Sequence, residues 1–361
     1  MAETEQQSGF VAWVRAQSGI VRALVFTGIM VAILLGLILL ATGIFYLNVQ
    51  NIPRVASAAI LNDVTVSEHV IFEDEQAYPG ALATAPDGTL YIGSFATGAV
   101  WSADAEGNYA EIPATREQIG SVIGLDVDAE GTLYVLDRID PLTRAGAIVW
   151  QITSEGDLTQ MGELPLDGRT QVIEPNDIAV DDAGNVYVVD WALERVMRLD
   201  PNGDASIWWV TRDDTGDPAP TALAYSAADD SLLIGDLTLN TIYRVPTTAT
   251  DTFAATETIY RHDRAIDTPG INGLTVAPDG TLYVAALDVN RVGRIGDDGE
   301  LVYLAGAFRG ASDVAYVPTQ DRLYVNNWDQ RWLQPVSFLF FNFDVGARLP
   351  FSVDAVQLSA E

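Results

Sequence analysis

Residues 86–91 read Pro-Asp-Gly-Thr-Leu-Tyr, and residues 278–283 repeat the same six letters. Four weaker copies follow the same plan, in which a polar turn precedes a short apolar run. The last positions of the six copies are 91, 134, 187, 233, 283 and 324, so neighbouring copies lie 41 to 53 residues apart. A repeat of about 40–50 residues with several strands per copy is typical of the blade of a β-propeller.

Each copy reads as four short strands joined by tight turns. In the fifth copy, apolar residues 271–277 precede the Asp-Gly turn and residues 281–285 follow it. Asp-Gly and Gly-Asn pairs supply the positive φ angles that tight hairpins need. Alternating apolar residues at 291–295 indicate a third strand, and residues 301–305 indicate a fourth. Because an open array would leave unpaired sheet edges, we expect six copies to close into a ring.

The N-terminal part of the repeat region is expected to close this ring. The stretch from Val64 to Phe72 precedes the first copy and reads as a strand. We expect it to pair with the C-terminal strands and to complete the last blade, since pairing removes the free edges. The predicted fold class is therefore all-β, a six-bladed β-propeller over residues 64–361, preceded by one transmembrane α-helix.

An uncharged segment precedes the predicted propeller. No residue from position 23 to position 53 carries a charge, and residues 23–47 are almost wholly apolar. At about 1.5 Å per residue, such a helix exceeds the ~30 Å hydrocarbon core of a bilayer. We expect a transmembrane helix over residues 23–47. It follows a cytoplasmic or interfacial segment at residues 1–22 and precedes a stalk at residues 48–63.

The arginines near this segment predict its orientation. Arg15 and Arg22 precede the span, and only Arg54 follows it closely. This bias favours a single-pass protein of the cell membrane with a cytoplasmic N-terminus and an extracytoplasmic propeller. A cleaved signal peptide is the alternative, because residues 56–58 (Ala-Ser-Ala) resemble a cleavage site, but the apolar run is too long and too far from them.

Composition excludes several kinds of chemistry. The chain of 361 residues has a formal net charge of −31, and its 19 basic residues are all arginine. Nucleic acid is not an expected partner, because phosphate binding needs a basic face. Without cysteine or lysine, thiolate and Schiff-base chemistry are excluded. Any metal site would consist mostly of Asp, Glu, Asn and carbonyl oxygens, which suit calcium, magnesium or manganese.

Two kinds of short motif carry a family resemblance. Residues 174–180 (Glu-Pro-Asn-Asp-Ile-Ala-Val) and 271–274 (Ile-Asn-Gly-Leu) are similar to Pro-Asn-Gly strand openings, and residues 188–190 and 234–236 are similar to Tyr-Val-Ala-Asp strand ends. With these motifs, the region from 64 to 360 resembles NHL-type repeats and the gluconolactonase/regucalcin and strictosidine synthase-like propellers. The resemblance implies the fold but leaves activity open, since such propellers include lactonases, lyases and binding modules.

For a gluconolactonase, the resemblance implies a divalent cation at one mouth of the central channel, held by a Glu, one or two Asn and an Asp at strand openings. The six corresponding positions, termed the strand-opening column, hold Gly80, Ile123, Asn176, Thr221, Asn272 and Ser312. Only Asn176 and Asn272 are of ligand type, and they are the weak metal candidates. No position is anionic, although charged ligands supply most of the attraction for such cations. Asp177 and Asp313 lie one residue further, where alternation turns side chains away from the channel.

Acidic residues also end the second strands of several predicted blades. The first interpretation is a structural role, in which Asp137, Asp190 and Asp236 accept hydrogen bonds from loop amides, as does Asn327 in the sixth blade. The alternative is a polar ring at the channel mouth. The resulting candidates for ligand binding are Asn176, Asp177, Asp190, Asp236, Asn272 and Asp313.

Two aromatic segments are candidate interfaces. Residues 335–350 contain Phe338, Phe340 and Phe341. They read either as an outer or third strand of blade six, or as an exposed patch that contacts the bilayer or a partner subunit. Trp208 and Trp209 are adjacent in a predicted outer strand, so alternation requires one of them to face away from the inner side of its sheet.

Two functions follow from these patterns. The one favoured is a membrane-anchored binding or scaffolding propeller, an accessory subunit with a protein partner in a membrane complex, because the strand-opening column lacks acids. The alternative is a divalent-metal-dependent lactone or ester hydrolase of the gluconolactonase type.

Overall fold

The computed structural model describes most of the chain, in ten segments. They are residues 9–50, 53–138, 146–164, 174–211, 216–263, 266–296, 298–329, 332–336, 341–344 and 347–358. The chain divides into two compact units: the first comprises residues 1–53 and 331–348, and the second comprises residues 54–330 and 349–361.

The first unit begins with two helices, α1 (Phe10–Ala16) and α2 (Gly19–Gln50). Helix α2 exceeds the predicted span of residues 23–47 at both ends. Within it, residues 19–44 are long and apolar enough to cross a membrane, and no other helix among the described residues is. The predicted apolar helix is thus confirmed as a candidate anchor. A signal sequence near the N-terminus passes the same test, so the orientation across a membrane stays a prediction.

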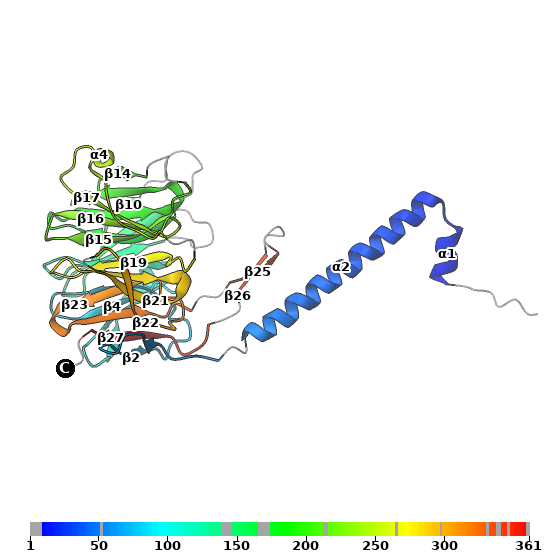
Figure 1. Ribbon diagram of the computed structural model, residues 1–361, viewed down its shortest axis with the longest axis horizontal. Helices are drawn as coiled ribbons and strands as arrows, with labels where there is room; N and C mark the ends of the chain where they lie inside the picture. Colours follow the sequence, from blue (N-terminus) through cyan, green and yellow to red (C-terminus); the bar gives the residue numbers. More distant parts are fainter. Residues whose placement is uncertain are drawn as a thin grey trace, which may run out of the picture. The chain divides into compact units, whose positions relative to one another are not determined.

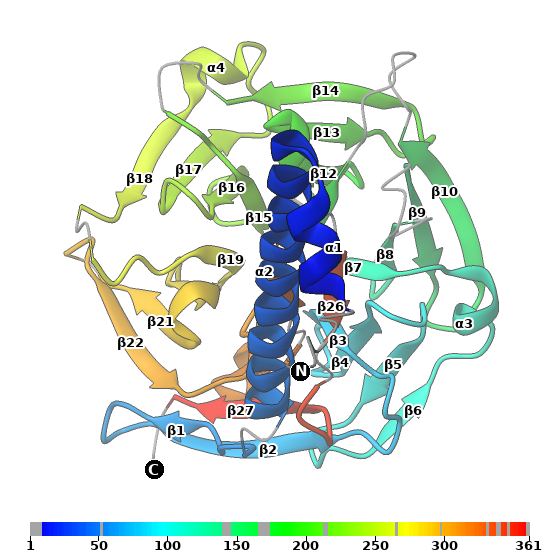
Figure 2. The same ribbon diagram turned by 90° about the vertical axis from the view of Figure 1, so that its right-hand side faces the viewer.

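The second unit is a six-bladed β-propeller, which confirms the predicted fold class (Figures 1 and 2). Blade one comprises β3 (Pro79–Thr84), β4 (Leu90–Ser94), β5 (Val100–Ala103) and β6 (Tyr109–Glu111). Blade two comprises β7 (Val122–Val127), β8 (Leu133–Asp137), β9 (Ala147–Ile152) and β10 (Leu158–Leu164). Blade three comprises β11 (Pro175–Val180), β12 (Val186–Asp190), β13 (Arg195–Leu199) and β14 (Ala205–Val210). Blades four and five comprise β15 (Pro220–Ser226), β16 (Ser231–Asp236), β17 (Thr241–Pro246), β18 (Glu257–Arg261); and β19 (Ile271–Val276), β20 (Leu282–Ala286), β21 (Arg291–Ile295), β22 (Leu301–Gly306).

Blade six is assembled from both ends of the propeller. Its order is β23 (Val314–Val317), β24 (Arg322–Asn326), β27 (Ser352–Gln357) and β2 (Thr65–Ile71). The pairing of β2 with β27 runs antiparallel from Thr65 opposite Gln357 to Ile71 opposite Ser352. The prediction that residues 64–72 close the last blade is confirmed.

Short elements fill the connections. The predicted stalk contains a two-residue strand, β1 (Ala58–Ala59), which pairs with β22 and adds a fifth strand to blade five. The remaining short elements are α3 (Thr115–Gln118), α4 (Thr252–Ala255) and the single 3₁₀ turns η1 (Trp191–Leu193), η2 (Leu287–Val289) and η3 (Pro318–Gln320).

The aromatic segment near the C-terminus is not part of a blade. Strands β25 (Trp332–Val336) and β26 (Phe341–Asp344) form a separate two-stranded sheet in the first unit. The interpretation of this segment as an outer or third strand of blade six is therefore wrong. Strands β27 and β2 occupy those places, and Pro335 lacks the amide that an inner strand must donate. Phe341 begins β26, whereas Phe338 and Phe340 lie outside the described residues.

The core consists of apolar side chains between neighbouring blades. Between blades three and four, both Trp208 and Trp209 pack against one cluster that includes Val189 and Ile234. The prediction that one tryptophan faces away is wrong, because the strand pairing shifts here: Trp209 pairs with Val196, while Ile207 pairs with the next residue. Such a bulge places two consecutive side chains on one side of the sheet. Neither tryptophan forms an exposed patch, since Trp209 is buried and Trp208 is half-buried.

Candidate functional site

The two ends of the propeller differ in their connections. We call one end the mouth face, where first strands begin and second strands end, as Pro175 and Asp190 do in blade three. We call the other end the turn face, where turns join first to second strands and third to fourth strands. The strand-opening column lies at the mouth face, at the beginnings of the first strands, which surround the centre of the ring (Figure 2).

The strand-opening column bonds neighbouring blades together. Asn176 donates from its Nδ2 to the carbonyl oxygen of Thr221 at 2.7 Å. Thr221 in turn donates from its Oγ1 to the carbonyl oxygen of Ile271 at 2.9 Å. Asn272 is half-buried, and no hydrogen bond of its side chain joins it to another described residue. Asn272 is thus the member of the column whose amide remains available to a ligand.

Gly80 occupies the position where the resemblance implies a glutamate. A Cβ at this position would lie 3.2 Å from the Cβ of Phe95 and 3.3 Å from the carbonyl oxygen of Val122. Both distances are shorter than ordinary van der Waals contact, so a larger side chain would require these neighbours to move. Blade one therefore has a close backbone contact where a gluconolactonase-like site needs an acid.

Three carboxylates lie in or just before first strands, and all three follow one pattern of hydrogen bonds. Asp177 accepts the amide of Leu223 in the next blade at 2.8 Å, and it also accepts the amide of its own successor, Ile178, at 2.8 Å. Asp313 accepts the amide of Leu82 at 2.7 Å, which joins blade six to blade one. Each carboxylate thus satisfies an amide on the first strand of the next blade and holds two blades together.

Asp126 is the third of these acids, and the sequence interpretation missed it. It accepts the amide of Val180 in blade three at 2.7 Å and the amide of Val127 at 2.9 Å. It lies two positions beyond the place of Asp177 in its own first strand. Continuing by alternate residues from Gly124, the position that corresponds to Asp177, would have found it.

Simple alternation does not determine the direction of the Asp177 side chain, because the strand pairing beside it is irregular. The pairing of β11 with β12 shifts by one residue between Pro175 and Asp177. This bulge resets the alternation before the acid is reached. Asp177 is buried, whereas Asp126 and Asp313 are half-buried.

Poor solvation changes the acidity of all three groups. Few waters reach them deep in the propeller, and this burial raises the pKa of Asp126 to about 7. Burial likewise raises the pKa of Asp313 to about 7. Burial, and then the nearby charge of Asp313, raises the pKa of Asp177 well above its usual range. Near neutral pH these carboxyl groups therefore retain protons to a degree that exposed aspartates do not.

The residues present do not fit the divalent cation that the resemblance implies. Both oxygens of Asp126, Asp177 and Asp313 already accept backbone amides. Among the described residues, no group of three or more acidic or histidine side chains is arranged to hold a metal ion. Calcium, magnesium and manganese prefer several free, charged oxygens. We therefore derive no metal-dependent step for this site.

The acids at the second-strand ends have the predicted structural role. Asp137 accepts the amides of Gly120 and Ser121 at 2.9 and 3.0 Å. Asp236 accepts the amides of Ala219 and Leu239 at 3.1 and 2.7 Å. Both acids therefore fix the loops of the mouth face and do not point freely into it.

Blades three and six use variants of this device. Asp190 accepts the amide of Glu174 at 3.0 Å and the Nε of buried Arg195 at 3.2 Å. In blade six, Asn327 accepts the amide of Arg309 at 2.8 Å, and the preceding Asn326 accepts the amide of Ser312 at 3.0 Å. The role of Asp190 and Asp236 in a ligand-binding ring stays a prediction.

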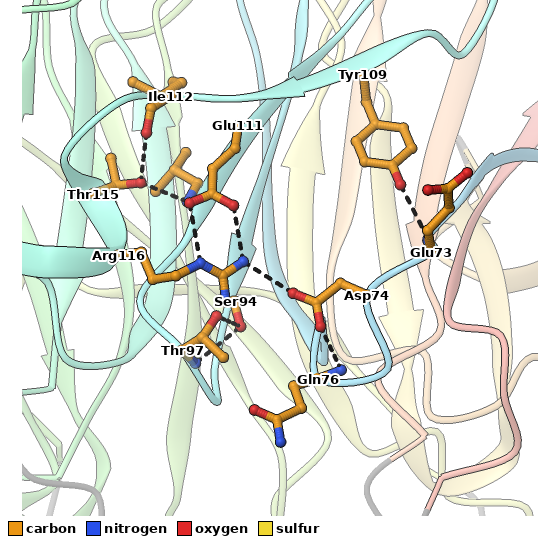
Figure 3. A network of polar contacts seen from close by, with 11 residues as sticks. Glu73, Asp74, Gln76, Ser94, Thr97, Tyr109, Glu111, Ile112, Thr115 and Arg116 are labelled. Atoms are coloured by element: carbon orange, nitrogen blue, oxygen red, sulfur yellow. Dashed lines mark hydrogen bonds and ion pairs between the residues drawn. The ribbon is translucent and has the colours of Figure 1, made fainter.

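Aromatic side chains and one ion-pair network form the mouth face where blades six and one meet. Phe95 packs edge-on against Trp328, with ring centroids 5.5 Å apart. The Nε1 of Trp328 is buried and has no hydrogen-bond partner among the residues that the structure describes. Figure 3 shows the network on the blade-one side, in which Arg116 bonds Glu111 at 2.8 Å and Asp74 at 2.9 Å. This junction combines two aromatic rings with the Nε1 of Trp328 as an available hydrogen-bond donor. No sequence motif predicted this combination.

Comparisons with known proteins agree with this architecture. A gluconolactonase structure from Xanthomonas campestris is 15% identical, with 85% of this chain and 98% of that chain covered and a TM-score of 0.56. Virginiamycin B lyase from Staphylococcus aureus is 13% identical, with 82% and 99% covered and a TM-score of 0.52. A luciferin-regenerating enzyme is 15% identical, with 81% and 95% covered and a TM-score of 0.57.

At these identities the structural likeness shows the fold alone. No curated protein sequence matches the chain. Residues 143–327, which are half of the chain, match the family described as the SMP-30/gluconolactonase/LRE-like region. The chain therefore belongs to the SMP-30/gluconolactonase/LRE-like family.

Proposed function

We propose that this protein is a membrane-anchored, extracytoplasmic binding module whose mouth face holds a ligand or a partner subunit. The observation that carries the proposal is that backbone amides already occupy the oxygens of the three buried or half-buried acids. Asp126, Asp177 and Asp313 each accept two backbone amides, so their oxygens hold blades together. A hydrolase of this family type would need a cation to polarise a carbonyl and to activate water.

The mouth face offers neutral groups for binding. Asn272 presents an amide without an internal partner, and Trp328 and Phe95 present aromatic rings. Trp191 is 38% exposed at the start of η1. Aromatic rings with a few neutral donors suit uncharged or amphipathic surfaces, and they provide no nucleophile or general base.

Membrane attachment is the second part of the proposal. It is supported by the apolar helix α2, by Arg15 before this helix and by Arg22 in its first turn. Protease added to intact cells should therefore remove the domain beyond Asn48. Full protection, with degradation only after permeabilisation, would reverse the proposed topology.

A metal-dependent lactone or ester hydrolase is the second candidate, and the family match favours it. Cation binding separates the two functions. A metal at a hundred times its dissociation constant adds about 2.7 kcal/mol to the stability of a protein that binds it only when folded. We expect calcium, magnesium or manganese at millimolar levels to change the melting temperature little. Ionic strength must be held constant, because a chain of net charge −31 attracts cations without a site.

Matched variants make this test decisive. Asn176→Ala combined with Asn272→Ala removes the amides of ligand type, and Asn62→Ala removes an exposed amide elsewhere. If one metal stabilises the wild type and the Asn62 variant strongly, while the double variant loses both this response and lactone hydrolysis, the protein is a hydrolase. Equal, small responses in all three proteins support the binding module.

A further inference from the structure

The chain between helix α2 and the propeller is short because its last part is fixed to the propeller. Arg54 forms an ion pair with Glu68 of β2, and Ser57 donates a hydrogen bond to Asp354 of β27. Only residues 51–53 therefore separate the end of α2 at Gln50 from the fixed position 54. At about 3.5 Å per residue, this connection spans at most about 14 Å.

The fixed segment leads to the mouth face. After Ser57 the chain forms β1, where Ala58 pairs with Gly306 and Ala59 with Ala305. Gly306 is the last residue of β22, and its other partner, Arg291, begins β21. Third strands begin, and fourth strands end, at the mouth face. The chain therefore joins the propeller sheets at the mouth-face rim of blade five.

Charge distinguishes the two faces sharply. Every sequential turn of the turn face contains at least one acidic residue, and none of these turns contains an arginine. Representative acids of these turns are Asp87, Asp104, Asp128, Glu155, Asp181, Asp200, Asp230, Asp251, Asp279, Asp298 and Asp321. Mouth-face connections are also acidic on balance, with Glu73, Asp74, Asp267 and Asp288 among their residues, but they contain arginines as well, such as Arg116 and Arg138. An anionic lipid surface repels the turn face more strongly than the mouth face.

Exposed apolar side chains concentrate on the mouth face. Ile71 is 48% exposed at the end of β2, and Val210 is 47% exposed at the end of β14. Ile266 is 74% exposed between β18 and β19, and Leu349 is 40% exposed just before β27. Together with Trp191 they are distributed around the same end of the propeller. Single apolar side chains with interfacial tryptophan are the groups that insert at a bilayer surface.

We propose that the mouth face of the propeller lies against the lipid surface of the membrane that anchors the chain, so that the centre of the ring faces the headgroup layer. This inference rests on the proposed membrane attachment. Its occupant is lipid, because the short connection keeps the propeller near the bilayer, the acidic turn face is repelled by it, and the apolar residues face it. A ligand would then reach Asn272 and Trp328 from the membrane surface.

Single-cysteine labelling of the full chain tests this orientation, because the chain contains no native cysteine. Ile266→Cys and Val210→Cys place a fluorophore on the mouth face. Phe253→Cys, 55% exposed in the β17–β18 connection, and Ala183→Cys place it on the turn face. Strands of five to seven residues separate the faces by about 20 Å. Each labelled protein is reconstituted in vesicles of phosphatidylcholine and phosphatidylglycerol that contain a headgroup-linked nitroxide quencher.

The expected result is severalfold stronger quenching at positions 266 and 210 than at positions 253 and 183. A Trp191→Glu substitution should weaken the quenching at position 210, whereas Phe253→Glu, the matched change on the turn face, should not. Equal or reversed quenching in protein that floats with vesicles after an alkaline wash overturns the inference alone. Protein that fails to float overturns the proposed membrane attachment, and the inference falls with it. No protein partner is present in these vesicles, so a face that contacts only a partner subunit would remain unquenched.

Discussion

Replacing Asp126 with asparagine should change how the stability of the propeller depends on pH. Burial raises the folded-state pKa of Asp126 from 3.8 to about 7. Between these values the folded protein binds more protons than the unfolded chain, so the contribution of this group to stability falls as pH rises. A shift of about three units corresponds to at most about 4 kcal/mol. Because the carboxyl group is half-buried and not fully enclosed, we expect about 2–4 kcal/mol.

The difference in stability between the wild type and the Asp126→Asn variant should change between pH 5 and pH 8. At pH 5 the protonated aspartic acid accepts the amides of Val127 and Val180 with separate oxygens, whereas asparagine has one oxygen for both. The variant should therefore be less stable than the wild type by about 1–3 kcal/mol. By pH 8 the wild type has lost the contribution of the proton, so the difference should vanish or reverse.

Urea unfolding of the full chain in detergent, followed by tryptophan fluorescence at constant ionic strength, measures this difference. Asp63→Asn, an exposed acid-to-amide change, is the control for altered net charge. The unfolding slope should be unchanged, so that midpoints report stability. If the wild type and the Asp126→Asn variant differ by the same free energy at pH 5 and pH 8, then burial does not control this proton and the argument fails.

Two further predictions concern closure and ion pairing. A chain that starts at Gly80 lacks β2 and should aggregate, whereas one that starts at Asn62 should remain soluble; equal behaviour in sedimentation would contradict the closure of blade six. Arg195→Ala leaves buried Asp190 without its cation and should cost about 3–5 kcal/mol, whereas Arg244→Ala, in an exposed pair, should cost about 0–1 kcal/mol in urea unfolding. Similar losses in both variants would show that burial does not govern these pairs.

The sequence predicted the fold well because its repeats carry strong local signals. Polar turns and apolar runs identified the blades, and the stretch before the first repeat identified the closing strand β2. Strand β1 was missed, since two alanines carry no strand signal. The hairpin of β25 and β26 was misassigned because an aromatic run reads as a strand without showing its partner. The likeness to NHL-type repeats and the partner subunit remain predictions.

The candidate site was harder to predict because it depends on pairing between strands. Alternation from sequence placed Trp208 and Trp209 on opposite sides, and it did not foresee the irregular pairing beside Asp177. In both cases a one-residue bulge, which depends on the neighbouring strand, interrupts the alternation. The surroundings of the Trp328 Nε1, which has no hydrogen-bond partner among the described residues, are formed by residues that are far apart in the chain, so no local motif indicates them.

The assembly of blade six also sets the time at which this protein can finish folding. Strand β2 emerges early from the ribosome, but its partner β27 begins only at Ser352 and is made long after it. Until Ser352–Gln357 have been made, β24 and β2 both lack the strand that joins them, and blade one lacks a completed blade six as one of its two neighbours. Contacts between such distant residues form slowly, and the open edges attract other chains meanwhile. Arrest of synthesis between Gly306 and Ser352 therefore yields a chain with five finished blades and a strong tendency to pair with other chains.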